Sequence, residues 1–149
     1  AGDPFVLEFN CRLGDPETQP LMMRLQSDLV DLALSAIHHK LHETSVQWDP
    51  RPALGVVLAA KGYPGEVELG TAIPGLPSKE TRDQKCFHAG TRLEDKKIVT
   101  AGGRVLCATA LGDTISAAQQ NAYSLCKQIA WPDAIYRRDI GYRAVKRGL

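Results

Sequence analysis

Glu8 and Asn10 stand two residues apart in the otherwise apolar stretch PFVLEFN, residues 4–10. Successive side chains of a β-strand point to opposite faces, so a strand here would place this carboxylate and this amide on one face. Carboxylate and amide oxygens are ligands that Mg²⁺ accepts, and they are costly to bury without a partner. The pair predicts either a site for a divalent cation or an edge strand whose polar face is solvated.

The loop that follows carries charges of both signs. Arg12, Asp15 and Glu17 lie in a Gly-Asp-Pro loop, and Pro20 suits the first turn of a helix that begins beyond it. A loop between a strand and a helix, next to a possible cation site, is a common place for a substrate to be held. Arg12, Asp15 and Glu17 are therefore candidate site residues.

Three later stretches carry weaker functional signals. His88, in CFHAGT, is predicted either to make a structural hydrogen bond or to serve a site. Arg104 follows a Gly-Gly pair that suits a plain hairpin turn or a backbone that approaches another group closely. Arg137 and Arg138 could form a fork for phosphate, or a solvated cluster paired with Asp139. Each stretch thus has a structural explanation beside the functional one.

The composition of the chain limits the functions open to it. Its 149 residues suffice for one ordinary domain, or for a small domain with a fragment of another. Because 18 Lys and Arg nearly balance 17 Asp and Glu, no overall field favours nucleic acid or an anionic membrane. The four cysteines form no C-x-x-C pair and predict free thiols in a reducing compartment.

Several familiar sequence signals do not occur in the chain. No apolar run reaches the roughly 20 residues that span a bilayer, and no signal-peptide pattern opens the sequence. Neither a Walker-type loop nor a G-x-G-x-x-G loop is present. We therefore expect a soluble, cytoplasmic protein with a possible metal pair and no nucleotide-binding loop of these types.

The clearest predicted helix follows the charged loop. Apolar residues recur every three or four positions from Pro20 to about Leu41, which predicts one helix with a single buried stripe. His38, His39 and His42 at its end could bind a metal, or could be solvated cations at a helix C-terminus.

A second unit is predicted beyond a polar connector. Residues 43–52 contain two prolines and separate residues 1–42 from residues 53–149. Strands gathered into hairpins, with helices set apart from them, indicate an α+β fold for the second unit. Its expected elements are a buried strand in ALGVVLAAKGYPG, a short strand within 70–77, an antiparallel meander with turns at 94–97 and 101–103, a helix from Asp113 or Thr114 to about Ile129, and a last short strand before an arginine-rich tail.

Five separated motifs, taken in order, resemble one protein family. They are EFNCRLGDPETQP, LGVVLAAKGYPG, FHAGT, GGRVLCATALGDT and YRRDIGYRA. Together they make essentially the whole chain similar to the C-terminal third of the bacterial glycinamide ribonucleotide synthetases, the phosphoribosylamine–glycine ligases. The resemblance implies the last strand and helix of an ATP-grasp domain in residues 1–42 and a small C-terminal α+β domain in residues 53–149. It also implies that the remaining ATP-grasp lobes precede Ala1, so we expect the chain alone to be inactive.

The same resemblance implies a reaction and roles for the candidate residues. Glycine and phosphoribosylamine would be joined through glycyl phosphate, with ATP hydrolysed to ADP and phosphate, in purine biosynthesis. Glu8 and Asn10 would bind Mg²⁺ or Mn²⁺, and Arg12 would stabilise charge during phosphoryl transfer. Asp15 and Glu17 would contact the amines of glycine or phosphoribosylamine. The 5′-phosphate of phosphoribosylamine would be contacted by Arg104, Arg137 and Arg138.

Two alternatives remain open. Glu-x-Asn is shared across the ATP-grasp superfamily, so the chain could belong to another ligase or carboxylase, although the Gly-Asp-Pro-Glu loop and FHAGT argue against this. The chain could also be a non-catalytic binding or assembly module. With the upstream lobes absent, we expect the apolar N-terminal segment to be disordered, docked on the C-terminal unit, or paired with a second copy or with the missing lobes as an upstream fragment. We expect no nucleic acid or membrane partner.

Overall fold

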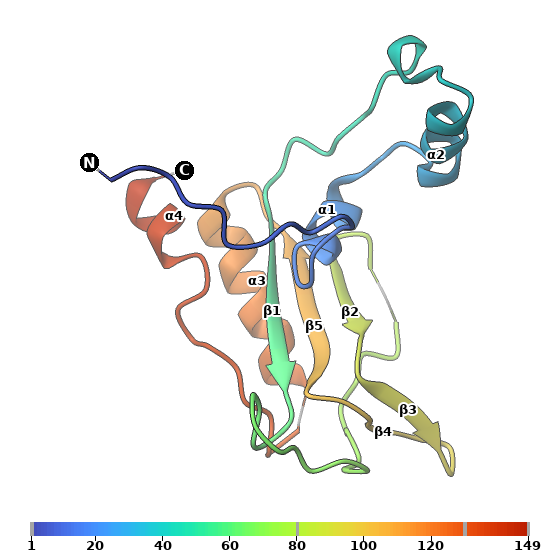
Figure 1. Ribbon diagram of the computed structural model, residues 1–149. Coiled ribbons are helices and arrows are strands. Elements are labelled where there is room, and N and C mark those ends of the chain that lie inside the picture. Colours follow the sequence, from blue (N-terminus) through green and yellow to red (C-terminus); the bar gives the residue numbers. More distant parts are fainter. Residues whose placement is uncertain (1, 80, 130, 149) are drawn as a thin grey trace.

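A small antiparallel sheet forms the centre of the molecule. The computed structural model describes residues 2–79, 81–129 and 131–148. Within them, β1 (Ala53–Ala59), β5 (Arg104–Leu111) and β2 (Gln84–His88) form one sheet in the order β1-β5-β2. The strands β3 (Thr91–Glu94) and β4 (Lys97–Thr100) form a second, two-stranded sheet below it (Figure 1). This antiparallel arrangement with packed helices is the predicted α+β class.

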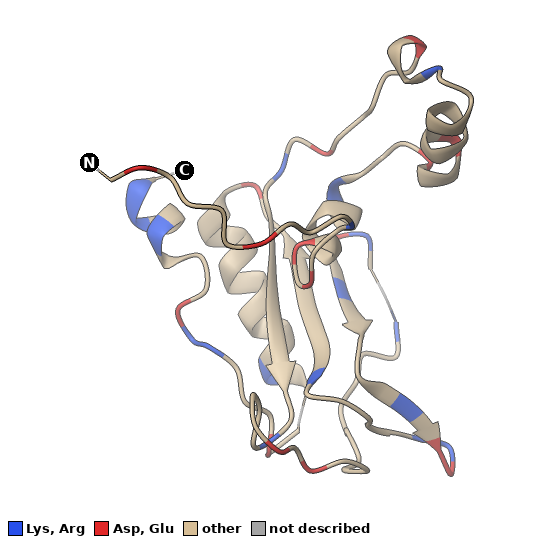
Figure 2. Cartoon of the chain, in the orientation of Figure 1, with Lys and Arg blue, Asp and Glu red and all other residues tan. Residues whose placement is uncertain are grey.

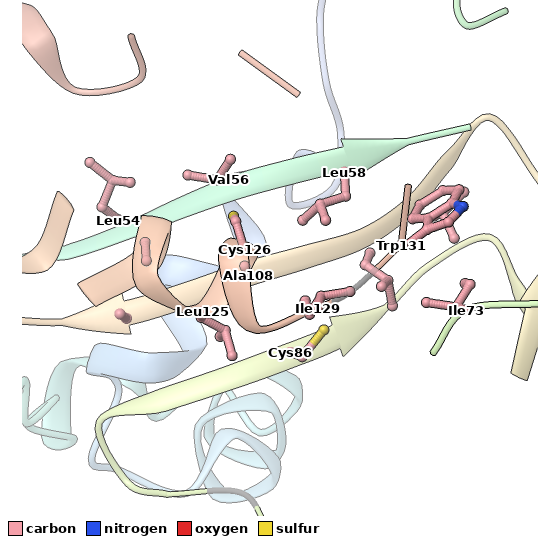
Figure 3. Close-up of a cluster of buried hydrophobic side chains, with 14 of the residues drawn as sticks. Leu54, Val56, Leu58, Ile73, Cys86, Ala108, Leu125, Cys126, Ile129 and Trp131 are labelled. Carbon is pink, nitrogen blue, oxygen red and sulfur yellow. The ribbon is translucent and has the colours of Figure 1, made fainter. Parts of the chain in front are cut away.

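Helices cover both faces of the three-stranded sheet. The helix α3 (Ile115–Gln128) buries the apolar core against one face, and Figure 3 shows Leu125 and Cys126 among the strand side chains. The helix α1 (Thr18–Arg24) lies against the other face. Gly55 permits this approach, because a Cβ there would lie 3.2 Å from Pro20 Cγ. The core on the α3 side contains Leu54, Val56, Leu58, Leu106, Ala108, Ala118, Ala122 and Leu125.

The start of α3 follows the predicted capping chemistry. Thr114 is the N-cap, and its Oγ1 accepts a hydrogen bond from the backbone N–H of Ala117 at 3.1 Å. A hydroxyl in this position satisfies one of the backbone donors that a helix start leaves free. The sequence prediction of a cap at Asp113 or Thr114 is confirmed.

The predicted meander is wrong in one of its two turns. The turn at Asp95 and Lys96 is present, with positive φ at both residues. At residues 101–103, however, the chain bulges instead of turning: the N–H of Ala101 donates to Gly90 O at 2.7 Å, and the N–H of Gly90 donates to Arg104 O at 2.9 Å. The strands β2 and β3 therefore run together against β4 and β5 as one long, bent hairpin, with extra residues inserted opposite Gly90.

The first part of the chain differs most from its prediction. Pro4–Asn10 was expected to be a strand, but no strand occurs there, and Phe5 and Leu7 are 85% and 96% exposed. The expected helix from Pro20 to Leu41 is two helices, α1 and α2 (Leu29–Ile37), followed by the 3₁₀ turn η1 (Leu41–Glu43). In Figure 1, α2 and η1 project away from the sheet.

The break between α1 and α2 has a local cause. Asp28 is the N-cap of α2 and its Oδ1 accepts from the N–H of Val30 at 2.7 Å. Just before it, the Ser27 hydroxyl accepts from the N–H of Gln47 at 2.8 Å, which fastens the break to the connector. Side chains of this kind compete with the helix for backbone donors, so an apolar stripe that continues across them does not keep the helix intact.

The last predicted short strands are single bridges. Ala72 pairs with Val99, and Ile135 pairs with Ala59, outside any named strand. The arginine-rich tail forms a short helix, α4 (Tyr142–Arg147), which carries positively charged residues (Figure 2). All four cysteines are free thiols, and three of them are buried, as predicted. Among the described residues, no helix is both long and apolar enough to cross a bilayer.

Candidate functional site

Glu8 and Asn10 are adjacent in space although their segment is not a strand. Asn10 Nδ2 donates a hydrogen bond to Glu8 Oε1 at 3.1 Å, and both side chains are exposed. An extended backbone places residues two apart on one side whether or not it is paired. This contact leaves Glu8 Oε2 and Asn10 Oδ1 as the oxygens that another group could approach.

The donors of this pair fit a magnesium ion. Mg²⁺ commonly takes one or two protein oxygens and completes its octahedron with water and substrate phosphates. Within the described part of the chain, no group of three or more His, Cys, Asp and Glu side chains gathers into a metal site. The three histidines near the end of α2 thus form no such site, and His42 lies 3.5 Å from Glu43.

Asp15 and Arg104, both predicted to contact substrate, contact each other. Asp15 Oδ2 lies 2.9 Å from Arg104 Nε, and Gln19 Nε2 donates to Asp15 Oδ1 at 3.3 Å. The ion pair joins the charged loop to the start of β5, the central strand of the sheet. Because both side chains are partly exposed, solvent screens this ion pair, and its contribution to stability is modest.

A bulge in the sheet turns Arg104 toward this loop. Leu58 pairs with Leu106 and Ala59 pairs with Arg104, so Val105 has no partner in β1. Val105 and Leu106 both enter the core on the α3 side. The extra residue shifts the alternation, and Arg104 consequently faces the α1 side, where Asp15 lies.

The other two loop residues make local contacts. Glu17 Oε1 accepts from the N–H of Gly14 at 3.0 Å, which closes the turn before α1. Arg12 Nη1 donates to Leu13 O at 3.2 Å, and the rest of this side chain is exposed. Glu17 therefore shapes the loop, while Arg12 extends from it.

The two C-terminal arginines lie apart from Arg104. Arg137 forms two hydrogen bonds to Asp139, at 2.9 and 2.8 Å, and this pairing raises the pKa of Arg137 and lowers the pKa of Asp139. Arg138 lines a separate hollow beside α3. No contact among the described residues joins Arg104 to either of them. Their predicted joint contact with one phosphate stays a prediction.

His88 has the structural role that the sequence offered as one of two possibilities. Its Nδ1 lies 3.0 Å from Thr91 Oγ1, across the junction of β2 and β3. Gly103, which directly precedes Arg104, lies against another part of the chain, because a Cβ there would lie 2.6 Å from Tyr63 Cδ2. The Gly-Gly pair thus serves a close approach within the chain.

A charge cluster around the buried Asp49 was missed from the sequence. Asp49 is 5% exposed, and Arg51 Nη2 lies 2.8 Å from both Asp49 Oδ2 and Asp83 Oδ1. Hydrogen bonds from the Arg51 side chain and backbone lower the pKa of Asp49 to about 2. The N–H of Asp49 donates to Arg24 O at 2.7 Å, and Nε of Arg24 donates to Asp49 O at 3.1 Å, so the cluster joins the end of α1 to the sheet. The sequence did contain a signal for this ion pair, because Asp49 and Arg51 stand two residues apart around a proline in the connector.

Comparison with known proteins places this arrangement in a family. The fold and the site define a class of protein: an α+β domain whose sheet is joined by the Asp15–Arg104 ion pair to a preceding loop with charged side chains. A family model described as "Phosphoribosylglycinamide synthetase, C domain" matches residues 53–143, which hold the sheet and α3. The chain belongs to this family, and the resemblance predicted from the five motifs is confirmed.

The similar proteins are bacterial ligases. The phosphoribosylamine–glycine ligase of Vibrio parahaemolyticus is 59% identical over 98% of the chain, and that of Escherichia coli O157:H7 is 56% identical over 98%. A crystal structure of phosphoribosylamine–glycine ligase from Thermotoga maritima matches 93% of the chain with a TM-score of 0.72 and 37% identity. The chain spans about a third of the length of these relatives, 34% in each case.

Proposed function

We propose that this chain acts as the C-terminal part of an ATP-dependent ligase that joins glycine to phosphoribosylamine in purine biosynthesis. The observation that carries the proposal is the 59% identity, over 98% of the chain, to a relative with the name of that ligase. The likeness favours this reaction over other ATP-grasp ligases or carboxylases. The alternative is a non-catalytic assembly module, which formation of product by the complete ligase in dependence on these residues would exclude.

The proposed reaction has two chemical steps. The terminal phosphoryl group of ATP passes to the carboxylate of glycine, giving glycyl phosphate and ADP. The amine of phosphoribosylamine then attacks the glycyl carbonyl, the amide bond forms, and phosphate leaves. Phosphoryl transfer depends mainly on positioning and on neutralising the charge of the phosphates.

Residues of the N-terminal segment are proposed to supply part of that neutralisation. Glu8 and Asn10 would hold Mg²⁺ or Mn²⁺ through the two oxygens that their mutual hydrogen bond leaves available. When bound, the cation neutralises the phosphate oxygens of ATP. Arg12, whose guanidinium extends from the loop, would contact the transferred phosphoryl group.

The contacts of Asp15 and Arg104 refine their proposed roles. Asp15 contacts Arg104 at Nε, and the guanidinium of Arg104 is the fork that would approach a substrate phosphate. We propose that Asp15 orients this fork. Glu17, which closes its own turn, would reach a substrate amine only by exchanging that contact.

The exposed apolar side chains are proposed to face other polypeptide. Phe5, Val6, Leu7 and Phe9 are each more than two thirds exposed, and α2 exposes Val30 and Ile37 to a similar extent. Exposed apolar side chains that gather along one segment or one helix often mark an interaction site. We propose that the other lobes of the complete ligase cover them, or that a second copy does so when those lobes are absent.

The test measures product formation in the complete ligase. Glu8→Gln and Asn10→Ala should raise the Mg²⁺ concentration needed for half-maximal formation of glycinamide ribonucleotide, because each removes an oxygen ligand or its charge. Asp3→Asn is the matched control, since Asp3 is an exposed acid of the same segment. Equal Mg²⁺ dependence in all three variants would refute the assignment of the pair.

A further inference from the structure

The amide of Gln19 has one end hydrogen-bonded and the other end buried without a partner. Gln19 lies in the first turn of α1, and its Nε2 donates to Asp15 Oδ1 at 3.3 Å. Its Oε1 is buried, and within the described part of the chain no donor reaches it. A buried acceptor that lacks a donor costs free energy, and each instance in a native protein calls for an explanation.

The carboxylate of Asp15 dictates which way this amide points. If the amide of Gln19 were turned over, its Oε1 would face Asp15 Oδ1, and two acceptors would stand against each other. With Nε2 toward Asp15, the contact is a hydrogen bond to a charged group, which is stronger than one between neutral groups. The bond to Asp15 therefore accounts for the unsatisfied oxygen at the other end of the amide.

The two oxygens of Asp15 are held by different parts of the chain. Oδ1 accepts from Gln19, and Oδ2 lies 2.9 Å from Arg104 Nε. Because a contact at each oxygen limits rotation of the carboxylate, Gln19 restricts the direction in which Asp15 meets Arg104. The helix that carries Gln19 is itself held on the sheet, where Pro20 lies close to Gly55. The contacts thus run from a fixed helix, through Asp15, to the guanidinium of Arg104.

We infer that Gln19 is a positioning residue: its amide fixes Asp15, and through Asp15 the guanidinium of Arg104, at a cost to the stability of the fold. For packing alone, methionine would serve better at this position, since it has a similar length and no oxygen to bury unsatisfied. Asp15 is 38% exposed, so water can replace the bond that Oδ1 would lose. Gln19→Met should therefore leave the urea midpoint of the chain unchanged or raise it.

Exchange of the Arg104 Nε proton with water measures this positioning in the chain itself. Nitrogen–proton correlation spectra show the Nε–H groups of arginines, and Arg104→Lys, which lacks this group, assigns the signal. Gln19→Met should speed the exchange about three- to tenfold, which corresponds to the loss of one hydrogen bond. In an Asp15→Ala background the same change should add nothing, because Gln19 acts through Asp15.

Gln120→Met is the matched control, because it removes the same amide from an exposed position of α3. This variant should exchange the Arg104 proton as the unchanged chain does. An unchanged exchange rate in Gln19→Met, a lower urea midpoint, or an equal effect in the Asp15→Ala background would overturn the inference.

The consequence for substrate binding rests on the proposed role of Arg104 in the ligase, whereas the positioning itself does not. In the complete ligase, Gln19→Met should raise the KM for phosphoribosylamine about three- to tenfold and leave kcat nearly unchanged, because only the orientation of the phosphate fork is lost. Faster exchange at Arg104 together with an unchanged KM would support the positioning and refute the proposed contact between Arg104 and the substrate phosphate.

Discussion

Gly90 is predicted to be the glycine on which the long bent hairpin depends most. A Cβ at this position would lie 2.6 Å from Arg104 O and 2.8 Å from Gly102 Cα, both backbone atoms. To reach an ordinary contact of 3.4 Å, one strand must move by about 0.8 Å. That movement also strains the hydrogen bond from the N–H of Gly90 to Arg104 O.

The expected cost of Gly90→Ala follows from these contacts. Overpacking costs about 1–3 kcal/mol and a weakened hydrogen bond about 1 kcal/mol, while replacing glycine returns somewhat less than 1 kcal/mol through the unfolded chain. The free energy of unfolding should therefore fall by about 1–3 kcal/mol. Urea denaturation followed by far-ultraviolet circular dichroism measures this as a lower midpoint with an unchanged slope.

Gly102→Ala is the control within the same bulge. Its added Cβ would lie 3.3 Å from Gly90 Cα, a distance that small adjustments relieve, so its midpoint should stay close to that of the unchanged chain. If Gly90→Ala and Gly102→Ala have the same midpoint, the close approach at Gly90 is not what holds the bulge, and the reasoning is refuted.

Three further predictions concern acid stability, capping and activity. The folded pKa of Asp49 is lowered from 3.8 to about 2, so the contribution of this carboxylate to stability is complete above pH 3.8 and is lost as the pH falls toward about 2. Asp49→Asn should lack this part of the pH dependence of the free energy of unfolding. An unchanged pH profile in the variant would contradict the role of Arg51. Thr114→Ala should lower the free energy of unfolding of the chain by about 1 kcal/mol in urea denaturation, whereas Thr44→Ala, outside any long helix, should change it little; equal losses would argue against the cap. The purified chain alone should neither bind ATP tightly in calorimetry nor form glycinamide ribonucleotide, and product from a sample free of longer species by mass spectrometry would show that the active site is misplaced.

Local chemistry allowed much of the C-terminal unit to be predicted. The apolar strand β1, the Thr114 cap and the stripe of α3 are each determined by residues near in sequence, and each was found as expected. The adjacency of Glu8 and Asn10 also followed from their spacing, because two residues of an extended chain share a side. The five motifs identified the family, which no single motif could have done.

The rest depended on contacts between distant residues. The apolar stripe from Pro20 to Leu41 suggested one helix, but the Ser27 and Asp28 side chains end it through contacts that include the connector. The bulge that turns Arg104 toward Asp15 arises from a register shift between β1 and β5, which sequence spacing does not encode. The cluster of Asp49, Arg51 and Asp83 likewise forms only when the connector meets the start of β2.

A chimaeric ligase tests whether these residues serve as the C-terminal part of the ligase. The 149 residues would replace the matching segment of the phosphoribosylamine–glycine ligase of Escherichia coli O157:H7, which is 56% identical to them over 147 residues. Formation of glycinamide ribonucleotide from ATP, glycine and phosphoribosylamine is then measured for the chimaera and for its Glu8→Gln variant. We expect turnover by the chimaera and a loss of Mg²⁺-dependent turnover in the variant. A chimaera that folds and binds ATP but forms no product would refute the proposed function, and a variant as active as the chimaera at low Mg²⁺ would refute the role of Glu8.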